Sequence, residues 1–387
     1  MRLMDLTRKL DIKSLLAKKS HFLFGPRGTG KSTLIRQALS ERFQVIDLLD
    51  SQTRLRLLQN PSELESLLWK NQMDGVVIDE IQKVPELLDE VHRLIEKRKI
   101  PFLLTGSSAR KLKRTAANLL GGRARMAQLF PLTYFEIPNF DLGRYLTYGG
   151  LPSVLMSEEP FEDLIGYVNT YLSEEIEQEA QVRQLGKFAR FLKSAAISNT
   201  QQINYASIGS DAMVSESTVR EHYQILKDTL IGDILEPWRE SKKRKAIQTP
   251  KFYFFDIGVT NAIVTKSSIS PHSDDYGKAF EHFIYMELRA ALSYQRIHAP
   301  LLYWRSVNKQ EVDFVIGDFI AIEVKAKERA TMRDTIGLQA IREENVFQKY
   351  FLVSLDLQRR QENGVTFIHW KEFLNLLWNE KLLVSSF

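Results

Sequence analysis

The sequence predicts an α/β protein that begins with a parallel sheet, continues through a helical region and ends in a second α/β unit. Three observations support this prediction: a glycine-rich loop between an apolar strand and a helix, a second apolar strand that ends in two acids, and strand-like alternation in the last third. Such features at strand ends are typical of open parallel sheets, in which the carboxyl ends of the strands line the ligand site. The expected boundaries give an N-terminal core over 1–140, a helical region over 141–265 and a C-terminal unit over 266–387.

The composition is that of an ordinary globular protein. The 387 residues are 44% hydrophobic and 26% charged, a length that suggests about two or three domains. The absence of cysteine excludes disulfides and thiolate metal sites. No apolar run is long enough to span a bilayer and the first residues show no signal-peptide pattern, so we expect a cytoplasmic protein without membrane partners. The net charge of +5 permits nucleic-acid binding and does not establish it.

The glycine-rich loop follows a short apolar strand, His21–Phe24, and precedes a helix that starts near Thr33. It fits the pattern G-x-x-x-x-G-K-[ST], the phosphate-binding loop of nucleotide hydrolases, and the alternative is a glycine turn that matches by chance. We expect Lys31 to reach the β- and γ-phosphates of ATP, and the hydroxyl of Ser32 to bind Mg²⁺. The predicted nucleotide-binding residues are Gly25, Pro26, Arg27, Gly28, Thr29, Gly30, Lys31, Ser32 and Thr33.

The second half of this site is expected at a strand over Gly75–Glu80. Its three β-branched apolar residues indicate burial, and its last two residues deliver carboxylates to the carboxyl edge of the sheet. We expect Asp79 to hold the Mg²⁺ shell, and Glu80 to accept a proton from the attacking water or to orient it.

Two more positions are candidates for catalysis. Ser107 follows an apolar strand over Ile100–Gly106 and is itself followed by Ser108. One of these two serines could sense the γ-phosphate or the attacking water. The alternative role is an N-cap for the next helix, and both roles stay open. Arg123 directly precedes a fifth strand and suits an arginine finger that reaches a neighbour's γ-phosphate, with Arg125 as the weaker candidate. The alternative for Arg123 is a surface ion pair.

These motifs, in this order, resemble the prokaryotic AAA-type (AAA+) ATPase family, whose members carry a C-terminal domain of unknown function. The matching segments are the phosphate loop, 76–85, 103–108, 121–123, 130–133 and 148–152. The resemblance implies ATP and Mg²⁺ as cofactors and a homo-oligomer, for example a hexamer, with the arginine finger acting in trans. By motif position it implies catalytic roles for Lys31, Glu80, Ser107 and Arg123, and Mg²⁺ binding by Ser32 and Asp79. A second sensor arginine in a helical lid is not evident in the sequence.

The middle of the chain predicts helices from 142 to 183, then three helices and two strands, the order of a winged helix. A third helix over Ser215–Asp228 has an apolar stripe and an opposite polar face, and a basic tip lies between the two strands. We expect this face and tip to contact DNA, and the alternative is a unit that packs between domains. The predicted DNA-binding residues are Thr218, Arg220, Gln224, Lys227, Lys242, Lys243, Arg244 and Lys245.

The last third contains an acid–acid–lysine pattern. Glu323 and Lys325 share one face of an apolar strand, Asp313 lies on the preceding strand, and Glu281 lies near the start of a long helix. Two carboxylates beside a lysine suit a second Mg²⁺ and phosphodiester hydrolysis. The pattern resembles the PD-(D/E)XK restriction-endonuclease-like fold, with Val312 in the place of the proline. The alternative is an inactive fold in which these residues form a buried ion-pair network.

Together these features favour an ATP-hydrolysing protein that acts on DNA, including branched DNA such as four-way junctions, with a C-terminal domain that binds or cleaves it. The alternative is a nucleotide-dependent switch or remodeller of protein partners with an inactive nuclease-like domain. The segment 51–74 lacks the aromatic-apolar-glycine tripeptide with which unfolding ATPases grip a chain. This weakens the unfolding version of the alternative and leaves the signalling version open.

Overall fold

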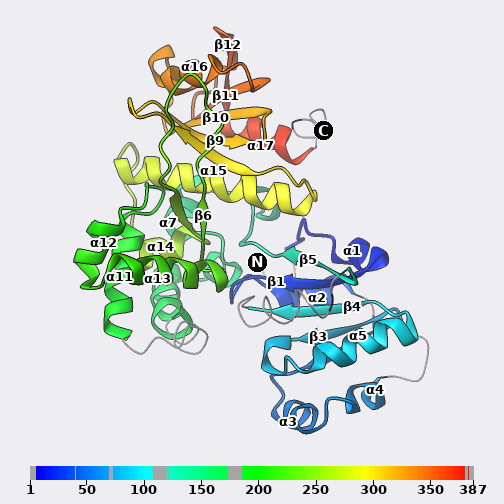
Figure 1. The fold of residues 1–387 in the computed structure, drawn as a ribbon. Helices are drawn as coiled ribbons and strands as arrows, with labels where there is room; N and C mark the ends of the chain where they lie inside the picture. The colour runs from blue at the N-terminus through cyan, green and yellow to red at the C-terminus, as the bar shows by residue number, and fades with distance from the viewer. Residues whose placement is uncertain are drawn as a thin grey trace.

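The computed structural model describes residues 6–39, 41–68, 73–107, 120, 122–172, 185–379 and 382, with the side chains of 171 and 172 left out. Three parts follow one another along the chain (Figure 1): an N-terminal sheet, a group of helices, and a C-terminal sheet. The long helix α15, Asp274–Tyr294, lies between the C-terminal sheet and the other two parts.

The N-terminal sheet has five parallel strands in the order β2-β3-β4-β1-β5, which confirms the predicted parallel core. Every residue of β1, β3 and β4 is buried, as expected for strands covered on both faces. The strands are β1 (Ser20–Phe24), β2 (Phe43–Asp47), β3 (Gly75–Asp79), β4 (Phe102–Gly106) and β5 (Ala124–Gln128). The helices are α1 (Ile12–Lys18), α2 (Lys31–Ala38), α3 (Ser51–Gln59), α4 (Glu63–Leu67) and α5 (Leu87–Arg98), with the short turns η2 (Ile81–Lys83) and η3 (Tyr134–Glu136).

The middle part packs its helices around one apolar cluster that joins Leu151 and Tyr167 to the helices further along the chain. Its elements are α7 (Leu142–Tyr148), α8 (Pro152–Leu155), α9 (Pro160–Gly166), the π-helix η4 (Tyr167–Leu172), α11 (Leu185–Ile197), α12 (Tyr205–Ala212), α13 (Glu216–Asp228), β6 (Gly232–Leu235), β7 (Lys251–Phe254) and α14 (Ile257–Ile263). Ser215 caps α13 by accepting a hydrogen bond from the backbone N–H of Thr218. The predicted order of three helices and an antiparallel strand pair is therefore present in α11–α13 and β6–β7.

The C-terminal sheet is six-stranded and mixed, in the order β12-β13-β11-β10-β9-β8. Apolar residues of α15 and α17 cover one face and those of α16 cover the other. The strands are β8 (Leu301–Arg305), β9 (Glu311–Ile316), β10 (Ile320–Lys325), β11 (Lys349–Ser354), β12 (Arg360–Glu362) and β13 (Val365–His369). The helices after α15 are α16 (Ile336–Arg342) and α17 (Trp370–Trp378), with the turn η5 (Met332–Thr335).

The chain between β6 and β7 runs along the outer edge of β8 (Figure 1). The N–H of Trp238 donates to the carbonyl of Tyr303 at 2.7 Å, and the N–H of Ile247 donates to the carbonyl of Arg305 at 2.8 Å. This loop therefore covers a sheet edge that would otherwise present unpaired backbone groups. The connection that the sequence predicts to be a projecting wing is thus part of the C-terminal sheet's border.

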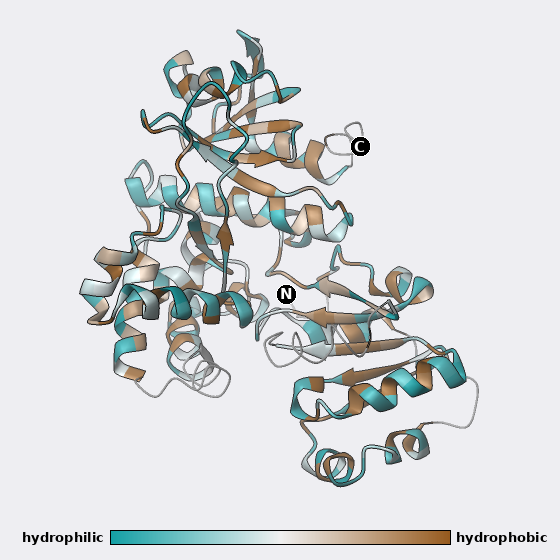
Figure 2. Cartoon of the chain, viewed as in Figure 1, coloured by the Kyte–Doolittle hydropathy of each residue, from teal (hydrophilic) through white to brown (hydrophobic). Residues whose placement is uncertain are grey.

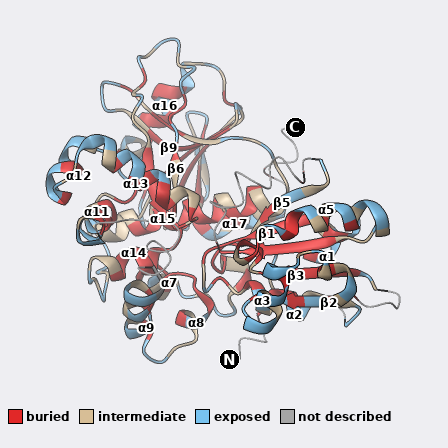
Figure 3. Cartoon of the chain, turned by 60° about the horizontal axis from the view of Figure 1, so that its bottom comes forward, coloured by how far each residue is buried: buried red, intermediate tan, exposed pale blue. Residues whose placement is uncertain are grey.

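Apolar residues gather on the strands of both sheets, while polar residues gather on the outer faces of the surrounding helices (Figure 2). The strands of both sheets are mostly buried, and the outer faces of the surrounding helices are mostly exposed (Figure 3). Among the described residues, no helix is both long and apolar enough to cross a membrane.

Candidate nucleotide site and C-terminal acid cluster

The phosphate loop connects β1 to α2 at the carboxyl edge of the parallel sheet. Gly28 and Gly30 have φ angles of 79° and 89°, in the left-handed region that favours glycine. A Cβ on Gly25 would lie 2.6 Å from the carbonyl oxygen of Leu129, so this position has no room for a side chain. Gly30 is also the N-cap of α2 and offers no side-chain cap, an arrangement in which a helix N-terminus binds phosphate.

Lys31, Ser32 and Asp79 meet beneath this loop. The Lys31 ammonium is buried and donates to the carbonyl oxygens of Gly25 at 2.6 Å and Pro26 at 3.2 Å. The Ser32 hydroxyl donates to Oδ2 of Asp79 at 3.1 Å. Because β3 and α2 bring these groups together, the two halves of the predicted site lie within hydrogen-bonding distance of each other.

Glu80 is linked to Ser107 through Gln82, a residue that the sequence analysis missed. Nε2 of Gln82 donates to a carboxylate oxygen of Glu80 and, at 3.1 Å, to the hydroxyl of Ser107. Glu80 has a φ of 60°, a left-handed conformation that is uncommon for a residue with a side chain and that turns the chain directly after β3. A Cβ on Gly106 would lie 2.7 Å from Oε1 of Gln82, so the glycine before Ser107 makes room for this amide.

Thr105 is a second residue that the motifs did not single out. Its hydroxyl donates to Oδ1 of Asp79 and accepts a hydrogen bond from the backbone N–H of Glu80 at 3.2 Å. Thr105 is fully buried on β4, which pairs with β3. Its side chain therefore fixes both acids relative to the neighbouring strand.

Arg8 holds the loop from the other side. Its guanidinium donates to the carbonyl of Thr29 at 2.7 Å and the carbonyl of Phe130 at 2.6 Å, and it pairs with Glu136 at 3.1 Å. One of its nitrogens also lies 3.4 Å from the hydroxyl of Tyr294 on α15. Burial lowers and Glu136 raises the pKa of Arg8, with a net rise, so this side chain remains a cation. Arg8 thus joins the phosphate loop to the long helix of the C-terminal part.

The helical region also contacts the loop directly. The hydroxyl of Tyr167 donates to the carbonyl of Arg27 at 3.0 Å, and a Cβ on Gly28 would lie 3.4 Å from the Tyr167 ring and 3.6 Å from Leu151. A Cβ on Gly30 would lie 3.7 Å from Pro152. The turn at 148–152 and η4 therefore lie directly beside the loop.

The turn at 148–152 is tied in turn to the start of α14. The N–H of Gly150 donates to the buried carboxylate of Asp256 at 2.7 Å, and a Cβ on Gly149 would overlap that carboxylate. A Cβ on Gly258 would lie 2.1 Å from the carbonyl oxygen of Tyr148. Gly149 of the turn and Gly258 of α14 thus make room for the close packing of these two segments.

The predicted DNA-contacting residues are not all exposed on one surface. Arg220 and Gln224 are exposed on α13; Arg220 stacks on the ring of Tyr205 at 3.7 Å, and Gln224 donates to Asp228 at 3.0 Å. Thr218 is half-buried at the capped start of α13. Lys227 lines a small cavity together with Pro26 of the phosphate loop, so it lies on the side of α13 that faces the N-terminal part.

The basic tip of the connection is anchored to α16 and the residues after it. Arg244 pairs with Glu343 at 2.8 Å, and the backbone N–H groups of Lys242 and Lys243 donate to the carboxylate of Glu344 at 2.8 and 3.1 Å. The side chains of Lys242, Lys243 and Lys245 remain exposed. Arg244 is therefore engaged within the protein, whereas three lysines of the tip face solvent.

The four residues of the C-terminal pattern do come together. Nζ of Lys325 lies 2.5 Å from Oε1 of Glu323, and Oδ2 of Asp313 accepts from the N–H of Val324 at 2.8 Å. Burial, and then Asp313, raise the pKa of Glu323 well above its usual range. Burial raises the pKa of Glu281 to about 7, although Lys251 favours its charged form.

Lys251 is the residue of this cluster that the sequence analysis missed. Its ammonium pairs with Glu281, Glu311 and Asp313. Burial lowers the pKa of Lys251, but these acids more than compensate and hold it well above its usual range. Among the described residues, no group of three or more histidine or acidic side chains is placed to hold a metal ion, and the expected second Mg²⁺ site is not shown.

Three family comparisons cover consecutive parts of the chain. Residues 139–270 match a domain of unknown function, DUF8612, and residues 276–373 match another, DUF4143. Residues 17–138 match the AAA domain and include the phosphate loop, the two acids and the five parallel strands. Over residues 17–138 the chain is therefore similar to the AAA domain, and this part is called the AAA domain below.

Relatives that align with most of the chain are found in bacteria and an archaeon. An uncharacterized protein of Mycobacterium tuberculosis is 26% identical over 306 residues, which cover 76% of this chain and 66% of that protein. Uncharacterized proteins of Haemophilus influenzae and Methanocaldococcus jannaschii are 24% and 22% identical over 303 and 344 residues, covering 68% and 80% of this chain and 72% and 75% of theirs. The alignment thus spans slightly less than two thirds of the mycobacterial protein.

Two solved structures are similar only at a low level. The Aeropyrum pernix ORC1 protein in complex with DNA is 13% identical with a TM-score of 0.25, over 64% of this chain and 86% of that one. The Bacillus subtilis DNA clamp loader delta protein is 14% identical with a TM-score of 0.24, over 58% and 88%. These superpositions carry no weight in the assignment of the AAA domain.

The AAA domain has the donor set that ATP and Mg²⁺ require. The hydroxyl of Ser32 and the carboxylate of Asp79 are hard oxygen ligands 3.1 Å apart, which suits Mg²⁺. When bound, the ion neutralises charge on the β- and γ-phosphates. Lys31 would bind the same phosphates, and Glu80, held by Gln82, would orient the attacking water or accept its proton.

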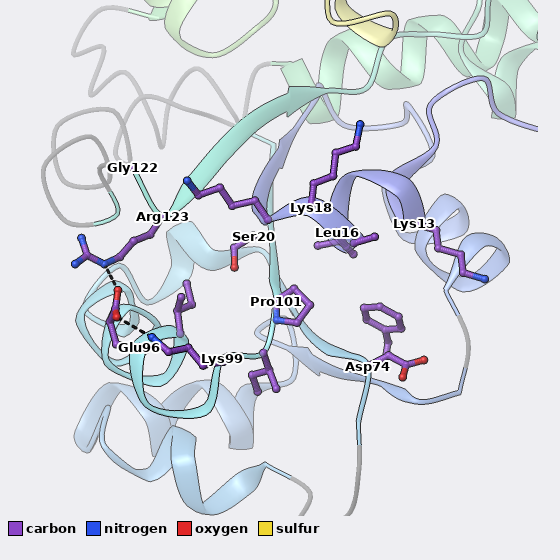
Figure 4. A pocket seen from close by; sticks show the side chains of 15 residues that line it. Lys13, Leu16, Lys18, Ser20, Asp74, Glu96, Lys99, Pro101, Gly122 and Arg123 are labelled. Atoms are coloured by element: carbon purple, nitrogen blue, oxygen red, sulfur yellow. Dashed lines mark hydrogen bonds and ion pairs between the residues drawn. The ribbon is translucent and has the colours of Figure 1, made fainter.

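Arg123 lies at the opposite edge of the AAA domain from the phosphate loop. It lines a cavity of 640 Å³ with residues that directly precede or begin the strands, such as Ser20, Phe43 and Pro101 (Figure 4). Its guanidinium pairs with Glu96 at 2.6 Å, and Lys99 pairs with the same acid. Arg123 therefore cannot reach the nucleotide site of its own chain. Ser108, the other serine considered for sensing, lies outside the described residues.

Proposed function

We propose that this protein is an ATP-driven switch that acts on DNA, with the AAA domain controlling the position of the three-helix unit α11–α13. The observation that carries the proposal is the hydrogen bond of Tyr167 to the phosphate loop, with Leu151 and Pro152 close to the Cβ positions of Gly28 and Gly30. These residues belong to the same apolar cluster as α11–α13, or lie directly beside it. Closure of the loop on phosphates therefore has a direct mechanical route to these helices.

The proposed DNA-binding surface is the exposed part of α13 and the tip of the β6–β7 connection. Arg220 and Gln224 on α13 suit contacts with bases or phosphates, and Lys242, Lys243 and Lys245 suit contacts with phosphates. Arg244 and Lys227 are left out of this surface because they contact Glu343 and the phosphate-loop side, respectively. The net charge of +5 supports a polyanionic partner.

The proposed assembly is a homo-oligomer in which Arg123 completes the nucleotide site of a neighbouring subunit. Its place at the amino edge of the parallel sheet supports this arrangement, since the phosphate loop occupies the carboxyl edge. Release of the ion pair with Glu96 would free the guanidinium for the neighbour's γ-phosphate.

A protein partner is the second candidate, and the anchoring of the basic tip favours it. Glu344 accepts from the backbone of Lys242 and Lys243, which holds the tip against the C-terminal part instead of presenting it as a mobile wing. In this version the same ATP-driven movement of α11–α13 changes the affinity for a protein.

Steady-state ATP hydrolysis tests the choice between DNA and protein. Rates are measured without nucleic acid and with single-stranded, duplex and four-way-junction DNA, with Glu80→Gln as the background. Stimulation by one DNA form, lost in Arg220→Ala with Gln224→Ala and kept in the exposed control Gln52→Ala, supports the DNA switch. Equal rates without binding to any of the DNAs contradict it and favour the protein partner.

A further inference from the structure

Acids of β9 and α15 surround a lysine that comes from outside the C-terminal sheet. Lys251 begins β7, and its Nζ lies 2.6 Å from Oε1 of Glu311, 3.0 Å from Oε1 of Glu281 and 3.8 Å from Oδ1 of Asp313. Its side chain is 3% exposed. Burial deprives this ammonium of its hydration, and the neighbouring carboxylates compensate for that loss.

The other groups around these acids are also donors. Tyr253 donates to Oε1 of Glu281 at 2.5 Å, and Arg305 pairs with Glu311 at 3.0 Å. With the Lys325–Glu323 pair, the cluster contains four acids and three basic side chains: Glu281, Glu311, Asp313 and Glu323 against Lys251, Arg305 and Lys325. The formal charge is therefore close to balance before any metal is added.

A divalent cation does not fit this arrangement. An ion bound by Asp313 and Glu281 would lie next to the Lys251 ammonium, and like charges at such distances repel strongly away from water. The pattern of Asp313, Glu323 and Lys325 that suggests a nuclease is present, yet the Lys251 ammonium already lies beside Asp313 and Glu281, two of the acids expected at the metal site.

We propose that Lys251 is the resident counter-ion of this cluster and serves as a latch that fastens the β6–β7 strand pair to the C-terminal sheet, in place of a metal-dependent cleavage centre. The latch is strengthened by the backbone pairing of the same connection with β8, where Trp238 and Ile247 donate to Tyr303 and Arg305. The C-terminal part then moves together with β6 and β7 as one body. This goes beyond the proposed switch and does not depend on the identity of its partner.

Thermal unfolding of the full chain tests the latch. Lys251→Met removes the charge at similar length and should lower the melting temperature of the C-terminal part by several degrees. Lys251→Met with Glu311→Gln should recover part of this loss, because the second change removes a carboxylate that has lost its partner. Lys371→Met, at an exposed position on α17, is the control and should melt like the parent protein.

Metal dependence separates the latch from a cleavage site. The parent protein should melt at the same temperature in EDTA and in millimolar Mn²⁺, whereas Lys251→Met, or its double variant where the single one does not fold, should gain stability from Mn²⁺. The parent protein should also leave plasmid DNA intact in Mg²⁺ or Mn²⁺. Two results would overturn the proposal. One is a stabilisation of the parent protein by Mn²⁺, or a nicking of plasmid DNA, that is lost in Asp313→Asn. The other is an unchanged melting temperature in Lys251→Met. ATP hydrolysis by the parent protein without DNA is measured in parallel. The melting temperatures test the latch and the hydrolysis rate tests the switch, so either proposal can fail without the other.

Discussion

The hydroxyl of Tyr167 donates a hydrogen bond of 3.0 Å to the carbonyl oxygen of Arg27, in the middle of the phosphate loop. One aromatic side chain of the helical region thereby holds the backbone that binds phosphate in the AAA domain. The same ring is also in contact range of the Cβ position of Gly28. Tyr167 belongs to the apolar cluster that contains residues of α11–α13, so it connects the loop to these helices.

Removal of this hydroxyl should uncouple the loop from the helices. In Tyr167→Phe we expect stability to fall by about 0.5–1.5 kcal/mol, as for the loss of one hydrogen bond. Nucleotide should still bind, while any stimulation of hydrolysis by the partner should fall severalfold. Denaturant unfolding and stimulated ATP hydrolysis measure the two effects, and Tyr148→Phe is the matched control. Full stimulation in Tyr167→Phe would show that the coupling runs elsewhere.

Gln82 should affect turnover and leave binding nearly unchanged. It positions Glu80 by donating to its carboxylate and ties it to Ser107. In Gln82→Ala we expect kcat to fall about tenfold, within the range of a misplaced catalytic group, with the Kd for ATP nearly constant. Glu80→Gln should bind ATP and turn over more slowly still, by about 100-fold or more. Phosphate release and fluorescent-nucleotide titration measure these quantities; a raised Kd with normal kcat in Gln82→Ala would make it a binding residue instead.

Mixing two inactive variants should restore activity if Arg123 acts in trans. Lys31→Ala should abolish ATP binding or hydrolysis, because the ammonium at the phosphate position is lost. Arg123→Ala should leave binding intact and lower hydrolysis by about 1000-fold, the effect of a missing finger. A mixture of the two contains interfaces with one intact loop and one intact arginine, so its rate should exceed that of either variant. A mixture as slow as the single variants would mean that Arg123 only pairs with Glu96. Arg125→Ala, at an exposed position on β5, tests the other candidate for the finger in the same assay.

Glu287 should make stability depend on pH. Burial raises its pKa to about 8, while the N–H of Tyr134 and the indole of Trp378 donate to its carboxylate. Because the folded pKa lies above the unfolded one, near 4.5, the folded state binds the proton more tightly. This contribution to stability is fully present below about pH 4.5 and is lost as the pH rises through 8. The free energy of unfolding of the parent protein relative to Glu287→Gln should fall across this interval, and a constant difference between them would contradict the prediction.

The nucleotide site could be predicted because its chemistry lies in short, contiguous motifs. The glycines at 25, 28 and 30 fix the path of the loop, and Asp79 ends a strand whose apolar run is recognisable in the sequence. Gln82 was missed because its role requires Ser107, which follows β4, and the pairing of β3 with β4 is a property of the fold. A glutamine two residues after Glu80, in a turn that follows a buried strand, was the only available signal.

The C-terminal cluster shows the limit of the same reasoning. Asp313, Glu323 and Lys325 lie close together in sequence, and the structure brings them together as expected. Lys251 comes from another part of the chain, 30 residues before Glu281, and a single lysine at the start of a strand gives no sign of this role. In the same way, the sequence predicts a wing at the basic tip and gives no sign of the contact that anchors it. The backbone of the tip donates to Glu344, which lies about a hundred residues further along the chain.

The pairing of the β6–β7 connection with β8 sets an order of events during synthesis. Residues 236–250 leave the ribosome before β8 exists, so the N–H groups of Trp238 and Ile247 stay bonded to water until their partners are made. Lys251 likewise remains hydrated until α15 and β9 supply Glu281 and Glu311. A nascent chain that stops before β8 therefore carries an unfastened basic loop, and only completion of the C-terminal sheet draws that loop into the fold.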